Sequence, residues 1–227
     1  MIGEENQAPV QSLLTYFSQG EDGTIFASAE SDWTKPYTMP DSFVIQQWSQ
    51  KNYQNLRVTR KIAFRPRYFV EVLEADGVPE SETADWVWHF SGKSVLPDPG
   101  KKLPDDYFVK KPFVHFTEIH AEELKKDGKT WKREYCDEDV HTAIYGMNAD
   151  MLCITAIGPD NPSSGKISWL IERRRGNTRF VTAHVIGSWR ERQEKPLQDV
   201  QFGWKQGKLK VALLEQDGKW REIVFDF

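Results

Sequence analysis

The residues best suited to bind a ligand are arginines and tryptophans in and beside predicted β-strands. Arg65 and Arg67 bracket the turn of a predicted hairpin, and a guanidinium group can bind a carboxylate through two parallel hydrogen bonds. Trp86 and Trp88 are two residues apart, which places both on one face of a strand. Flat aromatic rings can stack on sugar rings. A place in the core for the tryptophans, and a solvated surface position for the arginines, remain open as alternatives.

Three further residues extend this candidate binding set. Arg60 precedes the same hairpin and could bind a carboxylate in the same way. His89 follows Trp88, and we expect it either to satisfy its hydrogen bonds on one sheet face or to line a sugar cleft. Trp48 is another aromatic residue that could stack on a sugar.

Catalytic and metal-binding patterns are not evident in the sequence. There is no nucleophile elbow, phosphate-binding loop, dinucleotide fingerprint or HExxH motif. His115 and His120 are five residues apart, an odd spacing that would place them on opposite faces of a strand. Cys136 and Cys153 could form a disulfide or remain as two buried thiols, and no Cys/His cluster indicates zinc. We therefore expect no catalytic residue, metal or cofactor within this chain.

The composition argues against several classes of partner. The chain has 227 residues, 30 Lys+Arg, 34 Asp+Glu and a formal net charge of −4, with both signs interspersed. No long basic run is present, so we expect no nucleic acid partner. No apolar run approaches the ~20 residues that cross a bilayer, and no signal peptide is visible, so we expect no membrane partner. The nine tryptophans fit a β-rich core or a ligand surface.

Alternation of apolar and polar residues is the dominant pattern along the chain. It is clear over residues 56–64, 67–75 and 178–187, and this period of two is typical of half-buried antiparallel strands. Short turns with Gly, Asn or Pro separate such runs, as at 65–67, 175–177, 205–207 and 217–218. About fifteen strands without βαβ alternation predict an all-β fold: a large two-sheet antiparallel sandwich, supersandwich-like, with a small C-terminal β meander.

The expected organisation has three parts. Residues 1–9 form an N-terminal tail, 10–195 the antiparallel sandwich, and 196–227 a meander packed on the sandwich at its edge. Strands are expected near residues 10–18, 23–30, 43–49, 55–64, 67–75, 84–91, 113–121, 130–136, 140–147, 150–157, 166–174, 178–187, 198–204, 208–215 and 219–226. Residues 117–126 have the only helical composition, and they form either one short turn or a charged strand end. Residues 91–112, with four prolines, are expected to be a loop.

Several segments together resemble the β-sandwich of the heparinase II/III family of polysaccharide lyases. The segments are Arg60, Arg67-Tyr68-Phe69-Val70, Trp86-Val87-Trp88-His89, residues 150–159, and the hairpin of residues 168–174 and 178–183. Their order and spacing match the family pattern over about residues 10–190. Nothing in the chain corresponds to the α/α toroid that precedes the sandwich in these enzymes and carries most of their catalytic residues.

The resemblance implies the C-terminal sandwich of such a lyase, forming a cleft wall or supporting the catalytic toroid. The reaction would be β-elimination on a uronic-acid-containing polysaccharide. The implied partners are an acidic polysaccharide or oligosaccharide and an N-terminal toroid, and the implied location is periplasmic or secreted. We expect the isolated chain to be inactive. The alternative is a stand-alone, non-catalytic carbohydrate-binding or structural sandwich.

Overall fold

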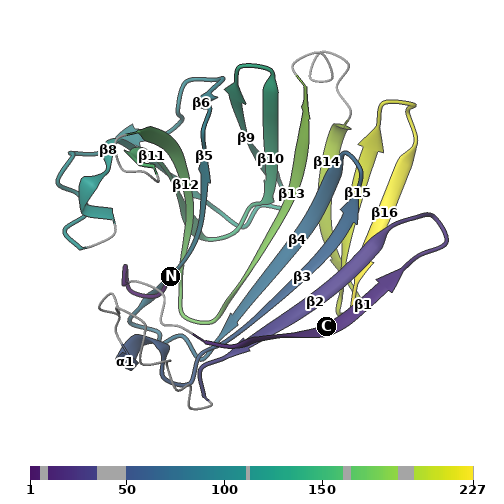
Figure 1. Cartoon of the computed structure of the whole chain (residues 1–227), viewed down its shortest axis with the longest axis horizontal. Coiled ribbons are helices and arrows are strands. Elements are labelled where there is room, and N and C mark those ends of the chain that lie inside the picture. Colours follow the sequence, from purple (N-terminus) through teal and green to yellow (C-terminus); the bar gives the residue numbers. More distant parts are fainter. Residues whose placement is uncertain (6–9, 35–49, 111–112, 161–164, 189–196, 227) are drawn as a thin grey trace.

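The computed structural model confirms the all-β prediction: an eight-stranded and a five-stranded antiparallel sheet pack as a sandwich, and a three-stranded sheet follows at the C-terminus (Figure 1). The structure describes residues 1–227 except 6–9, 35–49, 111–112, 161–164, 189–196 and 227. Among the described residues, no helix is long and apolar enough to cross a membrane.

The strands follow a non-sequential order in both large sheets. The eight-stranded sheet contains, in spatial order, β1 (Ser12–Gln19), β2 (Ile25–Asp32), β3 (Arg57–Arg65), β4 (Tyr68–Asp76), β13 (Thr178–Ser188), β10 (Val140–Met147), β9 (Thr130–Asp137) and β6 (Lys93–Ser94). The five-stranded sheet contains β5 (Thr83–Phe90), β12 (Lys166–Arg175), β11 (Met151–Pro159), β8 (Thr117–Leu124) and β7 (Lys101–Lys102). The described helical elements are α1 (Gln50–Tyr53) and the 3₁₀ helix η1 (Phe113–His115).

The C-terminal meander consists of β14 (Leu197–Lys205), β15 (Lys208–Glu215) and β16 (Trp220–Phe225). Gln206 and Gly207 both have positive φ, 53° and 77°, between the paired residues Lys205 and Lys208. Two consecutive positive φ values define the tight turn that matches the twist of a hairpin. The predicted hairpin at residues 205–207 is therefore confirmed.

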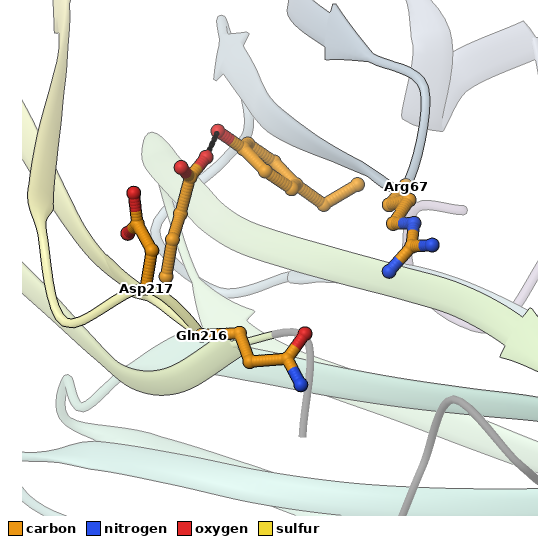
Figure 2. A pocket seen from close by; sticks show the side chains of 5 residues that line it. Arg67, Gln216 and Asp217 are labelled. Carbon is orange, nitrogen blue, oxygen red and sulfur yellow. Dashed lines mark hydrogen bonds between the residues drawn. The ribbon is translucent and has the colours of Figure 1, made fainter. Parts of the chain in front are cut away.

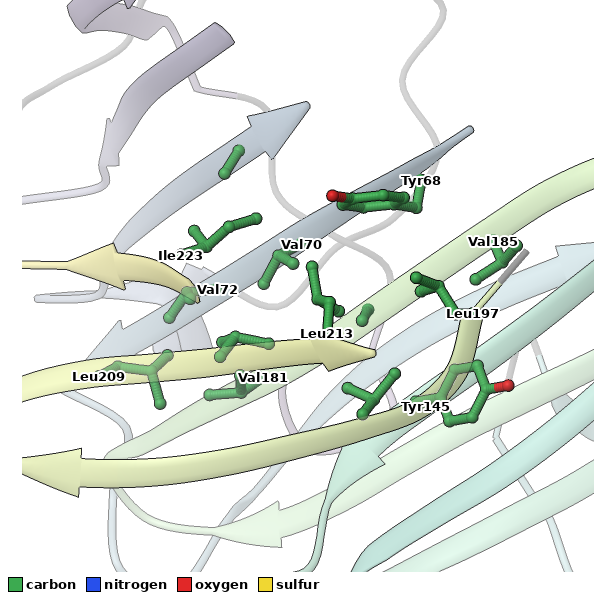
Figure 3. Packing of buried hydrophobic residues seen from close by; sticks show 14 of the residues in the cluster. Tyr68, Val70, Val72, Tyr145, Val181, Val185, Leu197, Leu209, Leu213 and Ile223 are labelled. Carbon is green, nitrogen blue, oxygen red and sulfur yellow. The ribbon is translucent and has the colours of Figure 1, made fainter. Parts of the chain in front are cut away.

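Both faces of β4 are largely buried, which explains why apolar residues occupy both parities of this strand. Val70 and Val72 point to the meander, where they join a core with Leu209 and Leu213, as Figure 3 shows. Leu73, of the opposite parity, packs in a second core against β5. The meander thus covers the face of the eight-stranded sheet that points away from the five-stranded sheet. The predicted small meander, packed on the sandwich, is confirmed. It lies on a sheet face and not at the edge, because its apolar side chains pack against those of the central strands.

Other local predictions are resolved as follows. The segment with helical composition forms strand β8 up to Leu124, paired with β7 and β11. The strand expected over residues 113–121 begins only at Thr117, after η1. The proline-containing segment 91–112 includes the two-residue strands β6 and β7, which we did not predict. The strand expected at residues 43–49 lies outside the described residues.

Candidate functional site

A cavity of about 550 Å³ lies between β5 and the first strands of the eight-stranded sheet. Trp86 and Trp88 of β5 form part of one wall, and Trp33 and Tyr53 form part of another. The rings of Trp33 and Tyr53 are 5.4 Å apart. The charged residues in the lining are Arg60 and Asp85, and Ser12 and Ser31 are also polar. A mostly aromatic and aliphatic lining with a few charged groups is typical of small-ligand sites, which span ~300–1,000 Å³.

A ladder of aromatic rings extends from this cavity between the two sheets, with rings from β5 of the five-stranded sheet and from β13 and β4 of the eight-stranded sheet. Ring centroids are separated by 5.6 Å from Phe180 to Trp86, 4.4 Å from Trp86 to Trp88, 5.9 Å from Trp88 to His184, and 4.4 Å from His184 to Phe69. Phe180, Trp86 and His184 are buried, whereas Trp88 and Phe69 are half-buried. Trp88 is therefore the tryptophan of the pair that a ligand can contact more extensively.

Arg60 is the cation beside the tryptophan pair. Its Nε donates a short hydrogen bond to Glu71, whose carboxylate is 1% exposed, while the Arg60 side chain is 54% exposed. Within the described part of the chain, the two terminal nitrogens of Arg60 have no hydrogen-bond partner. These nitrogens form the outer edge of the guanidinium group, so they can donate two parallel hydrogen bonds to a carboxylate.

Glu71 and His184 lie beneath Arg60 but are poorly placed for acid–base chemistry. Burial raises the pKa of Glu71, and the positive charge of Arg60 opposes this rise. Burial, reinforced by Arg60, lowers the pKa of His184 to about 3, so the imidazole is neutral near pH 7. His184 Nε2 is 2.9 Å from the Thr182 hydroxyl and 3.7 Å from the Glu71 carboxylate. Because both titratable side chains are almost fully buried, the geometry suits binding better than proton transfer to a substrate.

Asp85 forms a structural ion pair with Arg173. Both of its carboxylate oxygens accept hydrogen bonds from Arg173, each at 2.8 Å, and Arg173 also donates to Glu4 at 2.6 Å. The backbone of Asp85 is bonded to Met1. These contacts fix the N-terminal residues along β5 and close one end of the cavity. The Asp85 side chain lies on the face of β5 opposite Trp86 and Trp88, and its role is to hold the cavity wall in place.

The arginines predicted to bind substrate lie away from the tryptophan pair. Nη1 of Arg65 donates to Asp22 at 2.6 Å and to the Thr24 hydroxyl at 2.9 Å, across the turn that joins β1 to β2. The Arg65 side chain is only 16% exposed, so little of it is accessible to a ligand. Arg65 is therefore a poor candidate for binding a carboxylate.

Arg67 is exposed and lines a shallow pocket of about 380 Å³ between the β3–β4 and β15–β16 turns. Arg67 and Asp217 come from opposite sides of this pocket (Figure 2). Glu215 also lines it, accepting hydrogen bonds from Tyr68 at 3.0 Å and from Arg221 at 2.6 Å. Two carboxylates beside Arg67 make the pocket unfavourable for an anionic sugar.

His89, also predicted to bind substrate, does not line the cavity. His89 is exposed on the face of β5 opposite Trp86 and Trp88, with its ring 4.9 Å from that of Trp169. Trp48 lies outside the described residues. Of the five described residues that were predicted to bind substrate, only Trp86 and Trp88 line the aromatic cavity. Arg60, which the sequence placed among the arginines that could bind a carboxylate, lines it too.

Several residues of this site were missed by sequence reasoning. The burial of Glu71 could have been predicted from the sequence. Glu71 alternates with the apolar residues Phe69 and Leu73, so all three point to the same, buried face of the strand. Trp33, just after β2, and Tyr53, the last residue of α1, carried no such signal, because only the tertiary fold brings them to β5.

Metal and disulfide sites are not present in the described residues. No group of three or more His, Cys, Asp or Glu side chains in the described ranges is placed to hold a metal ion. Cys136 and Cys153 lie in different sheets, on β9 and β11, and both are free thiols. Both thiols are therefore free, as in the second alternative, but only Cys153 is buried and Cys136 is half-buried.

Comparison with known proteins gives no further assignment. No protein-family model matches the chain, and no curated protein is significantly similar to it.

Proposed function

We propose that this chain is a non-catalytic β-sandwich that binds a uronic-acid-containing saccharide in the aromatic cavity between its sheets. The supporting observation is the placement of Trp88 beside the exposed outer edge of Arg60 in one cavity. A uronate offers both a carboxylate for a guanidinium group and C–H groups for an aromatic face. The tilt of 37° between Trp86 and Trp88 leaves the two rings non-parallel, so one sugar ring stacks on Trp88 rather than on both.

Such a site would take part in catalysis if this chain is the sandwich domain of a heparinase II/III-type lyase. In that setting, the chain forms one wall of a substrate cleft, and a toroid domain supplies the acid and base. Support for this assignment comes from the sequence resemblance together with the antiparallel sandwich. It is also supported by the ion pairs of Glu71 and Asp85 with arginines. Because both carboxylates are paired, neither is available as an acid or base, and the cavity is suited to binding.

The expected affinity is weak. Arg60 is already paired with Glu71, and partly exposed ion pairs contribute only ~0.2–1 kcal/mol. The net charge of −4 further disfavours a polyanion. We expect a dissociation constant in the millimolar range, about −4 kcal/mol, with stacking on Trp88 supplying most of the specificity.

A titration with uronate oligosaccharides and with uncharged oligosaccharides of equal length tests the binding site. Trp88→Ala should abolish binding of both, whereas Arg60→Gln should remove the preference for uronate and its dependence on salt. Trp220→Ala and Arg67→Ala are matched controls, because both residues are exposed and neither lines the cavity. Binding that persists in Trp88→Ala and Arg60→Gln, or binding of aliphatic ligands in preference to sugars, would overturn the proposal.

A second measurement tests the absence of turnover. The purified chain, incubated with alginate, heparin, heparan and chondroitin, should give no increase in the absorbance of the unsaturated uronate product. Sustained product formation that is lost in Trp88→Ala would place the catalytic groups within this chain.

A further inference from the structure

Strand β1 is an exposed and uncharged edge of the eight-stranded sheet. It pairs only with β2 among the described strands. Its sequence, Ser-Leu-Leu-Thr-Tyr-Phe-Ser-Gln, contains no charged residue. Leu13, Leu14, Tyr16 and Phe17 are 55%, 68%, 56% and 65% exposed. A long apolar edge of this kind presents unpaired backbone groups and is a template for another strand.

The other sheet edges of the described structure are all protected. β6 and β7 have two residues each, and β7 consists of two lysines. β5 is covered by the N-terminus, through an Ile2–Ala84 bridge and a Gly3 N–H to Thr83 carbonyl bond of 2.8 Å. β14 and β16 carry charged residues, among them Asp199 and Glu222. Charge, short length and covering protect these edges, and within the described structure β1 has none of the three. Its one protecting feature is a bulge between Leu14 and Tyr16.

We propose that β1 pairs antiparallel with β1 of a second copy of this chain, so that two eight-stranded sheets join into one continuous sheet across a two-fold axis. A second copy is favoured because the neutral strand meets its own equivalent without like-charge repulsion. An isologous contact of this kind also closes after two copies.

The bulge in β1 fixes which side chains would meet. The register between β1 and β2 shifts between Leu14 and Tyr16, and as a result Leu14 and Phe17 lie opposite Ala29 and Ala27. Those two alanines share one face of β2 because they are two residues apart. Leu14 and Phe17 therefore also share one face, despite their odd spacing.

The two-fold axis then places Leu14 of one copy opposite Phe17 of the other, on the same face of the joined sheet. Antiparallel pairing with Leu14 opposite Phe17 of the second copy places the reciprocal pair, Phe17 opposite Leu14, on the same face. Directly opposed apolar side chains are the stabilising unit of a sheet. Pairing Leu13 opposite Phe17 is excluded, because these residues point to opposite faces, and directly opposed residues of neighbouring strands share a face.

The oligomeric state of the full chain tests this proposal. Sedimentation velocity or light scattering over a range of protein concentrations should show a monomer–dimer equilibrium. L14K/F17K should be monomeric, because each lysine would face a lysine. L14K/F17E should remain dimeric, because each lysine would face a glutamate. Both variants change exposed residues, and circular dichroism should verify that they fold.

Cross-linking tests the register independently. In a Cys136→Ser background, L14C/F17C should give a covalent dimer with a short bismaleimide, whereas the control L13C/F17C should not. A wild-type chain that stays monomeric at every concentration would overturn the proposal. Equal dimerisation of the two charged variants, equal cross-linking of the two cysteine variants, or open-ended oligomers would also overturn it.

Discussion

Removing one partner of the bidentate ion pair between Asp85 and Arg173 should cost much stability, because the other charge would stay buried. The Asp85 side chain is fully buried and that of Arg173 is 11% exposed, with two hydrogen bonds of 2.8 Å between them. Asp85→Asn preserves the shape of the side chain but leaves the guanidinium charge without its main partner. Removing one partner of a buried pair costs ~3–5 kcal/mol.

Glu4 places the expected cost at the lower end of this range. It remains 2.6 Å from Arg173 in the variant and is 21% exposed, so part of the charge stays compensated. We expect Asp85→Asn to lower the free energy of unfolding by about 3 kcal/mol. For a chain of this size, this loss corresponds to a fall in melting temperature of roughly 6–12 °C.

Urea unfolding at pH 7, followed by tryptophan fluorescence, measures this cost. The matched control is Glu222→Gln, which breaks the pair between Glu222 and Lys210 at 2.6 Å, with the two side chains 50% and 35% exposed. The control should cost at most about 1 kcal/mol, because solvent screens a surface pair. Equal losses in the two variants would refute the argument that burial sets the strength of the Asp85–Arg173 pair.

Three further outcomes are expected. Gly146→Ala should destabilise the fold by about 1–3 kcal/mol, because a Cβ there would lie 2.1 Å from the indole ring of Trp131. In the same denaturation assay, Gly203→Ala should be neutral or slightly stabilising, because no atom lies within 4 Å of its Cβ position. Ellman's reagent should titrate Cys136 in the native protein but not Cys153, which is buried and whose pKa burial raises to about 12, and two thiols should react in urea; two fast native thiols would contradict this. Burial raises the pKa of Glu172 from 4.5 to about 7, so its contribution to stability is complete below pH 4.5 and is lost as pH rises through 7. The free energy of unfolding of Glu172→Gln should therefore rise relative to that of wild type by on the order of 3 kcal/mol between pH 4.5 and 8. A difference that does not change with pH would contradict this.

The sequence alone determined the local elements of this protein. The period of two in residues 56–64 and 178–187 is a local property of the chain, because alternate residues of any strand point to alternate faces. The tight turn at residues 205–207 was equally readable, because glycine adopts positive φ without steric cost. The shared face of Trp86 and Trp88 followed from the same alternation.

Only the tertiary structure decided which strands are neighbours and which faces are buried. β4 pairs with β13, more than 100 residues away in the chain, and this pairing brings His184 beside Glu71. No local pattern contains that information, because long-range pairing depends on how whole apolar faces are covered. The roles of the arginines were decided in the same way: Arg65 has a carboxylate partner in another hairpin, whereas the outer edge of Arg60 faces a cavity. A side chain's availability to a ligand depends on neighbours distant in sequence, and therefore only the folded structure could separate these two residues.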